Sequence, residues 1–166
     1  MDKKSRVVVN PHYTSRLLGP LALAAEMDAE GLVLGAVDYT NRRHCELVIE
    51  NLVRPTFERL DVSEATEVKN SLGYLGTDPN ARKSLIEDRL LLCGIPPEEH
   101  CKFITLLWAV LFDDEDGDAE SGFEQFKVVN KPLGRHRFSL IGPQKRTLAE
   151  QLDELRIQLA FLERQN

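Results

Sequence analysis

The stretch FITLLWAVLF, residues 103–112, is the longest apolar run in the chain and decides the fold class. Only its threonine interrupts the apolar residues, so periodicity does not separate a buried helix from a central strand. Because Thr, Val, Trp and Phe favour extended structure and the run is short, we predict a strand over Ile104–Phe112. The run is about half of the ~20 residues that cross a bilayer. We therefore place it in a core and expect no membrane partner.

Extended structure is also expected in the first third of the chain. Val7–Val9 is predicted to form a short strand, and a helix over Thr14–Met27 follows, divided at Gly19-Pro20. The apolar segment Gly31–Val37 is predicted to form a second strand, with Cys45–Glu50 as the returning strand of a hairpin. A helix over residues 41–53 stays open as the alternative, because Asn41 is a good N-cap.

The remaining elements are predicted mainly from helix start and stop signals. Ser63 caps a predicted helix that runs to Leu75, and Asp78-Pro79 starts another that runs to Gly94. Phe123–Val129 and Arg137–Ile141 are expected to form a strand pair, and residues 147–164 form the clearest predicted helix.

These elements predict an α+β fold: a small mixed β-sheet packed by helices from the middle third, with a C-terminal amphipathic, leucine-striped helix. Residues 1–143 would form a single α+β domain, and residues 144–166 a docking or dimerisation helix.

Composition and charge exclude several classes of protein. The chain has 166 residues, 42% hydrophobic and 29% charged, which is typical of one globular domain. Its net charge of −6 is concentrated in residues 61–130, with fifteen acids and six bases, whereas residues 131–166 carry four acids and seven bases. We therefore do not expect a nucleic-acid partner. Three cysteines do not make a disulfide framework, and with no continuous apolar leader we expect a cytoplasmic protein.

The C-terminal helix carries the strongest interaction signal. Five leucines recur at spacings of four and three residues, which places them along one helix face: Leu148, Leu152, Leu155, Leu159 and Leu162. The stripe is too short for a free coiled coil, so it docks either on its own core or on a partner. Ile157 and Phe161 form a second apolar edge, which leaves room for both contacts.

Two charged clusters are further candidates for partner binding. The acidic loop contributes Asp113, Asp114, Glu115 and Asp116, which would contact a basic partner. It is not an EF-hand, because Phe112 and Phe123 would occupy the first and twelfth ligand positions. The second cluster would contact an anion or an acidic partner through Arg135, Arg137, Lys145 and Arg146.

No catalytic or metal-binding motif is complete. His44-Cys45 and His100-Cys101 offer zinc-type ligands, but adjacent residues lack the short paired spacings of structural zinc sites. The sequence has no nucleophile elbow, P-loop or dinucleotide fingerprint. We therefore assign no catalytic residue, metal or cofactor. A small hydrolase-type enzyme, with its site at the mouth of the sheet, remains the alternative class.

The first third of the chain resembles the opening of MPN (JAB-type) domains. The resemblance rests on Val7–Pro11, on the segment EGLVLG at residues 30–35, and on the expected hairpin that ends at Asn51–Pro55. Asp28 stands near the position of the family's glutamate, but the chain has no H-x-H pair. The resemblance implies a metal-free scaffold domain.

Together these features predict a non-enzymatic interaction or regulatory protein, of the inhibitor, immunity or assembly-factor type. It would act through its acidic surface and its leucine-striped helix, either as a homodimer or on a basic protein partner.

Overall fold

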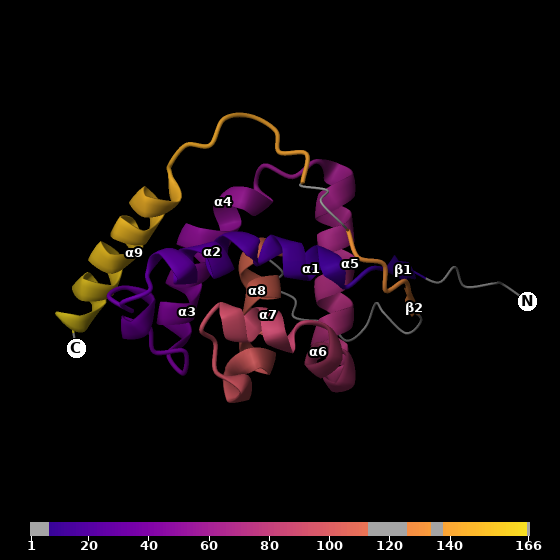
Figure 1. Cartoon of the computed structure of the whole chain (residues 1–166), viewed down its shortest axis with the longest axis horizontal. Helices are drawn as coiled ribbons and strands as arrows, with labels where there is room; N and C mark the ends of the chain where they lie inside the picture. Colours follow the sequence, from indigo (N-terminus) through magenta and orange to yellow (C-terminus); the bar gives the residue numbers. More distant parts are fainter. Residues whose placement is uncertain (1–6, 113–125, 134–137, 166) are drawn as a thin grey trace, which may run out of the picture.

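The computed structural model describes residues 7–112, 126–133 and 138–165. This part of the chain is mainly helical and contains a small two-stranded parallel sheet (Figure 1). In chain order its elements are β1 (Val7–Val9), α1 (His12–Leu17), α2 (Gly19–Met27), the 3₁₀ turn η1 (Leu34–Ala36), α3 (Arg42–Val48), the π-helical η2 (Ile49–Val53), α4 (Arg54–Phe57), α5 (Val62–Thr77), α6 (Pro79–Leu85), α7 (Glu87–Leu92), the 3₁₀ turn η3 (Pro97–Glu99), α8 (His100–Phe112), β2 (Phe126–Val128) and α9 (Leu148–Glu163).

The apolar run at residues 103–112 is a helix, so the strand predicted for Ile104–Phe112 is wrong. α8 buries Phe103, Ile104 and Leu107 against the core. A helix satisfies its own backbone hydrogen bonds, whereas a central strand needs a strand on each side. Thr105, which favoured extended structure, fits the helix because its hydroxyl donates to the carbonyl of Cys101 at 3.0 Å.

The predicted hairpin is also wrong at both of its strands. Within Gly31–Val37 only the 3₁₀ turn η1 is regular, and Cys45–Glu50 lies in α3 and η2. The alternative helix is confirmed, because the side chain of Asn41 accepts hydrogen bonds from the amides of Arg43 and His44. These bonds satisfy amide groups that the first turn of a helix leaves unpaired.

Both strands of the observed sheet lie in segments predicted to be strands, but their pairing was not predicted. β1 is confirmed, and it pairs in parallel with β2, Val7 opposite Phe126 and Val9 opposite Val128. The predicted pairing of residues 123–129 with 137–141 is wrong in the described positions, because residues 138–141 form no strand. Instead, the amide of Ile141 donates to the carbonyl of Arg59 at 2.7 Å.

The helix boundaries follow some of the predicted signals and depart from others. The first predicted helix is divided at Leu18 into α1 and α2, as the Gly-Pro pair indicates. Asp61 rather than Ser63 caps α5, and Asp78 caps α6 with Pro79 in the first turn. The helix predicted to run to Gly94 is broken at Ile86 into α6 and α7.

Helices of the middle third pack on the sheet, as expected, but the centre of the molecule is helical. α5 contacts β1 and α1, and Thr14 Oγ1 lies 2.6 Å from Ser71 Oγ inside the α1–α5 contact. α9 lies at one end of the molecule, against α2, α3 and η2, while β1 and β2 lie at the opposite end (Figure 1). The predicted domain boundary at residue 143 stays a prediction.

Candidate functional site

The C-terminal helix begins at a complete capping box. Thr147 Oγ1 accepts from the amide of Glu150 at 3.2 Å, and the Glu150 carboxylate accepts from the amide of Thr147 at 2.7 Å. This reciprocal pair satisfies two of the amides that a helix start leaves without a partner. The start of α9 is therefore fixed by local sequence.

The leucine stripe of α9 faces the interior of its own chain. Leu155 is fully buried, Leu152 and Leu159 are buried, and Leu148 and Leu162 are half-buried against the same core. These side chains pack on the elements that α9 contacts, α2, α3 and η2. Partner binding by the five leucines stays a prediction, while the structure shows them filling the chain's own core.

A polar contact fixes the rotation of α9 about its axis. Asn51, in the π-helical turn η2, is buried and donates to Oε1 of Gln158 at 2.8 Å. The amide of Gln158 in turn donates to the Glu154 carboxylate at 2.8 Å. Because buried polar groups need their partners, this contact restricts which face of α9 points outward.

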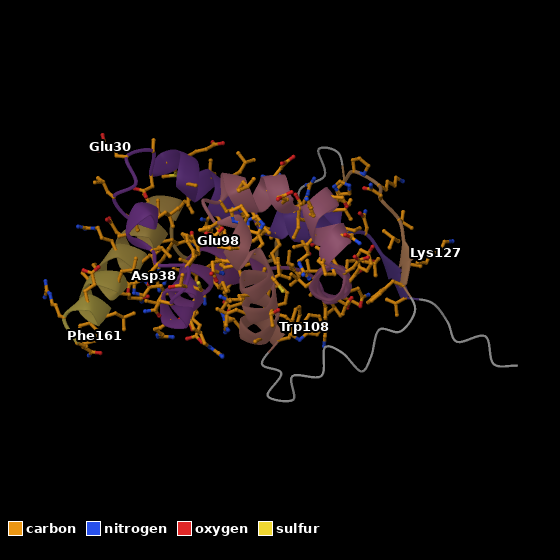
Figure 2. The ribbon with its side chains drawn as sticks, turned by 90° about the horizontal axis from the view of Figure 1, so that it is seen from below. Glu30, Asp38, Glu98, Trp108, Lys127 and Phe161 are labelled. Carbon is orange, nitrogen blue, oxygen red and sulfur yellow. The ribbon has the colours of Figure 1, made fainter. Side chains whose placement is uncertain are left out.

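The face of α9 opposite the leucines is partly apolar and open. Ile157 and Phe161 are each 59% exposed, and Ala160 between them is exposed. Figure 2 shows Phe161 at the outer margin of the molecule. Asp153 and Arg164 lie on the same side at the two ends of the apolar residues, since positions three and four apart share a helix face. We call Asp153, Ile157, Ala160, Phe161 and Arg164 the outer face of α9.

Hollows lie on both sides of the ridge that Phe161 forms. One, of about 530 Å³, lies between α3 and α9 and is lined by Leu47, Ile157, Phe161 and Leu162, with Arg43, Glu50, Gln158 and Gln165. The other, of about 290 Å³, is lined by Arg156, Ile157, Ala160, Phe161 and Arg164. A ridge flanked by hollows is a shape that another helix can pack against.

A separate cavity gathers part of the predicted basic cluster. Lys145 and Arg146 line a space of about 440 Å³ together with Arg54 and Arg59. Arg135 and Arg137, the other members of the predicted cluster, lie outside the described residues. The sequence did not indicate Arg54 and Arg59, because only the return of residues 141–146 over α4 brings them to Lys145 and Arg146 (Figure 1).

The acidic loop was predicted to contact a basic partner. Asp113, Asp114, Glu115 and Asp116 lie outside the described residues, so their partner contact stays a prediction. In the parts of the chain that are described, no three His, Cys, Asp or Glu side chains gather as a metal site requires.

The two histidines of the zinc-type pairs have structural contacts, and Cys45 and Cys93 are buried. His44 Nδ1 accepts from the amide of Asp38 at 3.1 Å, and His100 Nε2 donates to the carbonyl of Ile95 at 2.9 Å. Burial raises the pKa of the Cys45 thiol to about 11 and that of Cys93 to about 12. Since the thiolate is the nucleophile, neither cysteine is activated for catalysis.

Two of the three segments behind the resemblance to MPN domains are not strands in the structure. The G-x-L-x-G segment at residues 31–35 is not a strand, and the expected hairpin is helical. Asp28, near the position of the family's glutamate, fixes a loop: its carboxylate accepts from the amides of Val33 and Leu34, the latter at 2.7 Å. Asp28 therefore has a local structural role.

No helix among residues 7–112, 126–133 and 138–165 is long and apolar enough to span a bilayer. Comparison of the chain with protein-family models, curated proteins and solved structures finds no match.

Proposed function

We propose that this chain is a non-enzymatic interaction protein, and that its outer α9 face binds a second copy of itself. The observation that carries the proposal is the exposure of Ile157 and Phe161 on a helix whose opposite side is already packed in the core. A helix needs only one apolar face to dock on its own domain. A second apolar edge, rimmed by charges, is typical of an interaction site.

The charges on the outer face favour a second copy in antiparallel orientation. Asp153 and Arg164 are equally distant, along the helix, from the midpoint between Ile157 and Ala160. When two copies of α9 cross there in opposite directions, Asp153 of each lies level with Arg164 of the partner subunit. A two-fold interface needs such self-complementarity, because the same patch contacts itself.

The apolar residues also match in this register. Ile157 of each copy lies level with Ala160 of the partner subunit, because the two positions are equally distant from the same midpoint. The small side chain of Ala160 leaves space for that isoleucine. Within one chain, Arg156 and Asp153 form an exposed ion pair at 3.3 Å, so Arg164 of the partner subunit adds a second cation beside Asp153.

A charge exchange tests this register. Asp153→Arg places two arginines opposite each other and Arg164→Asp places two aspartates, so each single variant should weaken the dimer about tenfold. The combined variant restores both pairs and should regain most of the affinity. Lys83→Asp on α6 reverses an exposed charge away from α9 and serves as the matched control.

The dissociation constants are measured by sedimentation equilibrium, with thermal unfolding of each variant to verify its fold. Single variants that associate like the unmodified chain contradict the proposal. A combined variant no stronger than either single one contradicts the antiparallel register.

A further inference from the structure

The cavity beside the start of α9 is enclosed by two stretches that are distant in sequence, residues 50–59 and 141–151. α4 supplies Arg54 and Pro55, the segment 141–146 forms the opposite wall, and Gln151 of α9 closes one end. Its volume of about 440 Å³ lies within the usual range for sites that bind small molecules, roughly 300–1,000 Å³.

Four cationic side chains line this cavity, and none of them forms an ion pair with a described residue: Arg54, Arg59, Lys145 and Arg146. The carboxylates of Glu50 and Glu58 also line it, and Glu50 lies 3.8 Å from Arg43. The four cations outnumber the two carboxylates, so the lining carries an excess of positive charge in a chain whose net charge is negative.

Hydrogen-bond donors in the lining are left without partners. The Nε atoms of Arg54 and Arg59 are buried and have no acceptor among the described residues. Their terminal nitrogens hold the walls instead, Arg59 by donating to the carbonyl of Gly142 at 2.9 Å and Arg54 by donating to that of Val110. The two guanidinium groups therefore keep unused donor capacity beside the cavity.

Gln151 provides an independent observation. It is only 7% exposed, it lines the cavity, and its side-chain amide has no hydrogen-bond partner in the part of the chain that the structure describes. Because its amide atoms are not fully enclosed, they are open to the cavity and can bond a ligand there. Pro55, Ile141 and Pro143 add apolar wall next to these polar groups.

We infer that this cavity binds a phosphorylated small molecule. Arginine side chains match the oxygens of a phosphate group, and Lys145 adds a flexible charge at the rim. The amide of Gln151 contacts a polar group of the ligand, and the apolar wall packs against its organic part. The site is independent of self-association, since Asp153, Ile157, Ala160, Phe161 and Arg164 are absent from its lining.

The test is calorimetric titration of the full chain with phenyl phosphate, a phosphate that carries a compact apolar group. We expect saturable binding to one site, tighter than that of inorganic phosphate. The variants Lys145→Gln with Arg146→Gln, and separately Gln151→Leu, should each weaken binding about tenfold, because each removes a charge-assisted or buried hydrogen bond. Both avoid Arg54 and Arg59, whose bonds hold the cavity walls.

A matched control is Lys83→Gln with Lys131→Gln, which removes the same charge from exposed positions outside the cavity and should leave binding unchanged. Absence of binding at about 10 mM phenyl phosphate, a concentration well above ordinary ligand affinities, overturns the inference. Equal losses of phenyl phosphate affinity in the control and in the cavity variants also overturn the inference. Binding of benzoate or a hexaglutamate peptide as tight as that of phenyl phosphate overturns the assignment to a phosphate.

Discussion

Asn51 and Gln158, far apart in the sequence, are joined by a 2.8 Å hydrogen bond between their side-chain amides. Asn51 also donates to the carbonyl of Leu47 at 2.8 Å, so one amide nitrogen joins α3, η2 and α9. Because the contact is specific in direction, it orients α9 with its leucines inward and leaves Ile157 and Phe161 outward. The exposed edge is therefore held by a polar contact as well as by apolar packing.

Replacing Asn51 with alanine should destabilise the fold. The change removes both bonds and leaves acceptors in a buried place, which costs about 1–3 kcal/mol. The measurement is the free energy of unfolding in urea. Gln165→Ala, at the exposed end of the chain, is the control and should change little. Equal stability of the Asn51→Ala variant and the unmodified chain would show that the contact does not hold α9.

Leu155 and Ile157 are neighbours that should respond oppositely to truncation. Leu155 is fully buried, so Leu155→Ala should lower the free energy of unfolding by about 2–5 kcal/mol. Ile157→Ala removes an exposed side chain and should change the stability by only about 0.5 kcal/mol. Urea unfolding of both variants checks the orientation of α9. A reversed order of the two effects would contradict it.

The three cysteines should differ in reactivity. Cys45 and Cys93 are buried, and burial raises the pKa of each thiol, whereas Cys101 is exposed. With a chromogenic thiol reagent at neutral pH, we expect one thiol to react quickly in the folded chain and all three to react in denaturant. A Cys101→Ala variant should lose the fast reaction. Fast reaction of a second thiol would contradict the described core.

Alkaline pH should destabilise the fold through the same two buried thiols. Their pKa rises from the ordinary value of 9.0 to about 11 for Cys45 and about 12 for Cys93. Above pH 9 the unfolded chain therefore releases thiol protons that the folded chain keeps, which favours unfolding. The contribution is fully present below pH 9 and is lost as the pH rises toward these higher values.

The measurement compares the urea midpoints at about pH 8 and about pH 10.5. The decrease should be smaller in a Cys45→Ala, Cys93→Ala variant, since that chain has no buried thiol to ionise. It should be unchanged in Cys101→Ala, the control for the exposed thiol. Equal decreases in all three chains would show that the buried thiols do not cause the pH dependence.

Local signals in the sequence predicted where several helices begin, but not how the apolar runs fold. Asn41, Asp78 and Thr147 are observed as N-caps, because capping depends only on residues within one turn. The run at residues 104–112 was misassigned because strand propensity depends on neighbouring strands, and none lies beside it in the described structure.

The two candidate sites also differ in how far the sequence predicts them. The outer edge formed by Ile157 and Phe161 was predictable, since helical periodicity places both residues outside the leucine stripe. The basic cavity was not, because Arg54 and Arg59 meet Lys145 only through the path of residues 141–146 over α4 (Figure 1). A cavity between distant segments leaves no periodic or spacing signal.

The most direct test of the proposed function is the mass of the chain in solution, measured by sedimentation equilibrium over a range of concentrations. One helix face makes a small interface, so we expect the mass to rise from 18.8 kDa toward twice that value at roughly micromolar concentrations or above. Ile157→Ser with Phe161→Ser should stay at 18.8 kDa, while Leu91→Ser with Leu92→Ser, a matched change of exposed apolar residues on α7, should associate like the unmodified chain. A mass of 18.8 kDa at every concentration, or unchanged association of the α9 variant, would contradict the proposal.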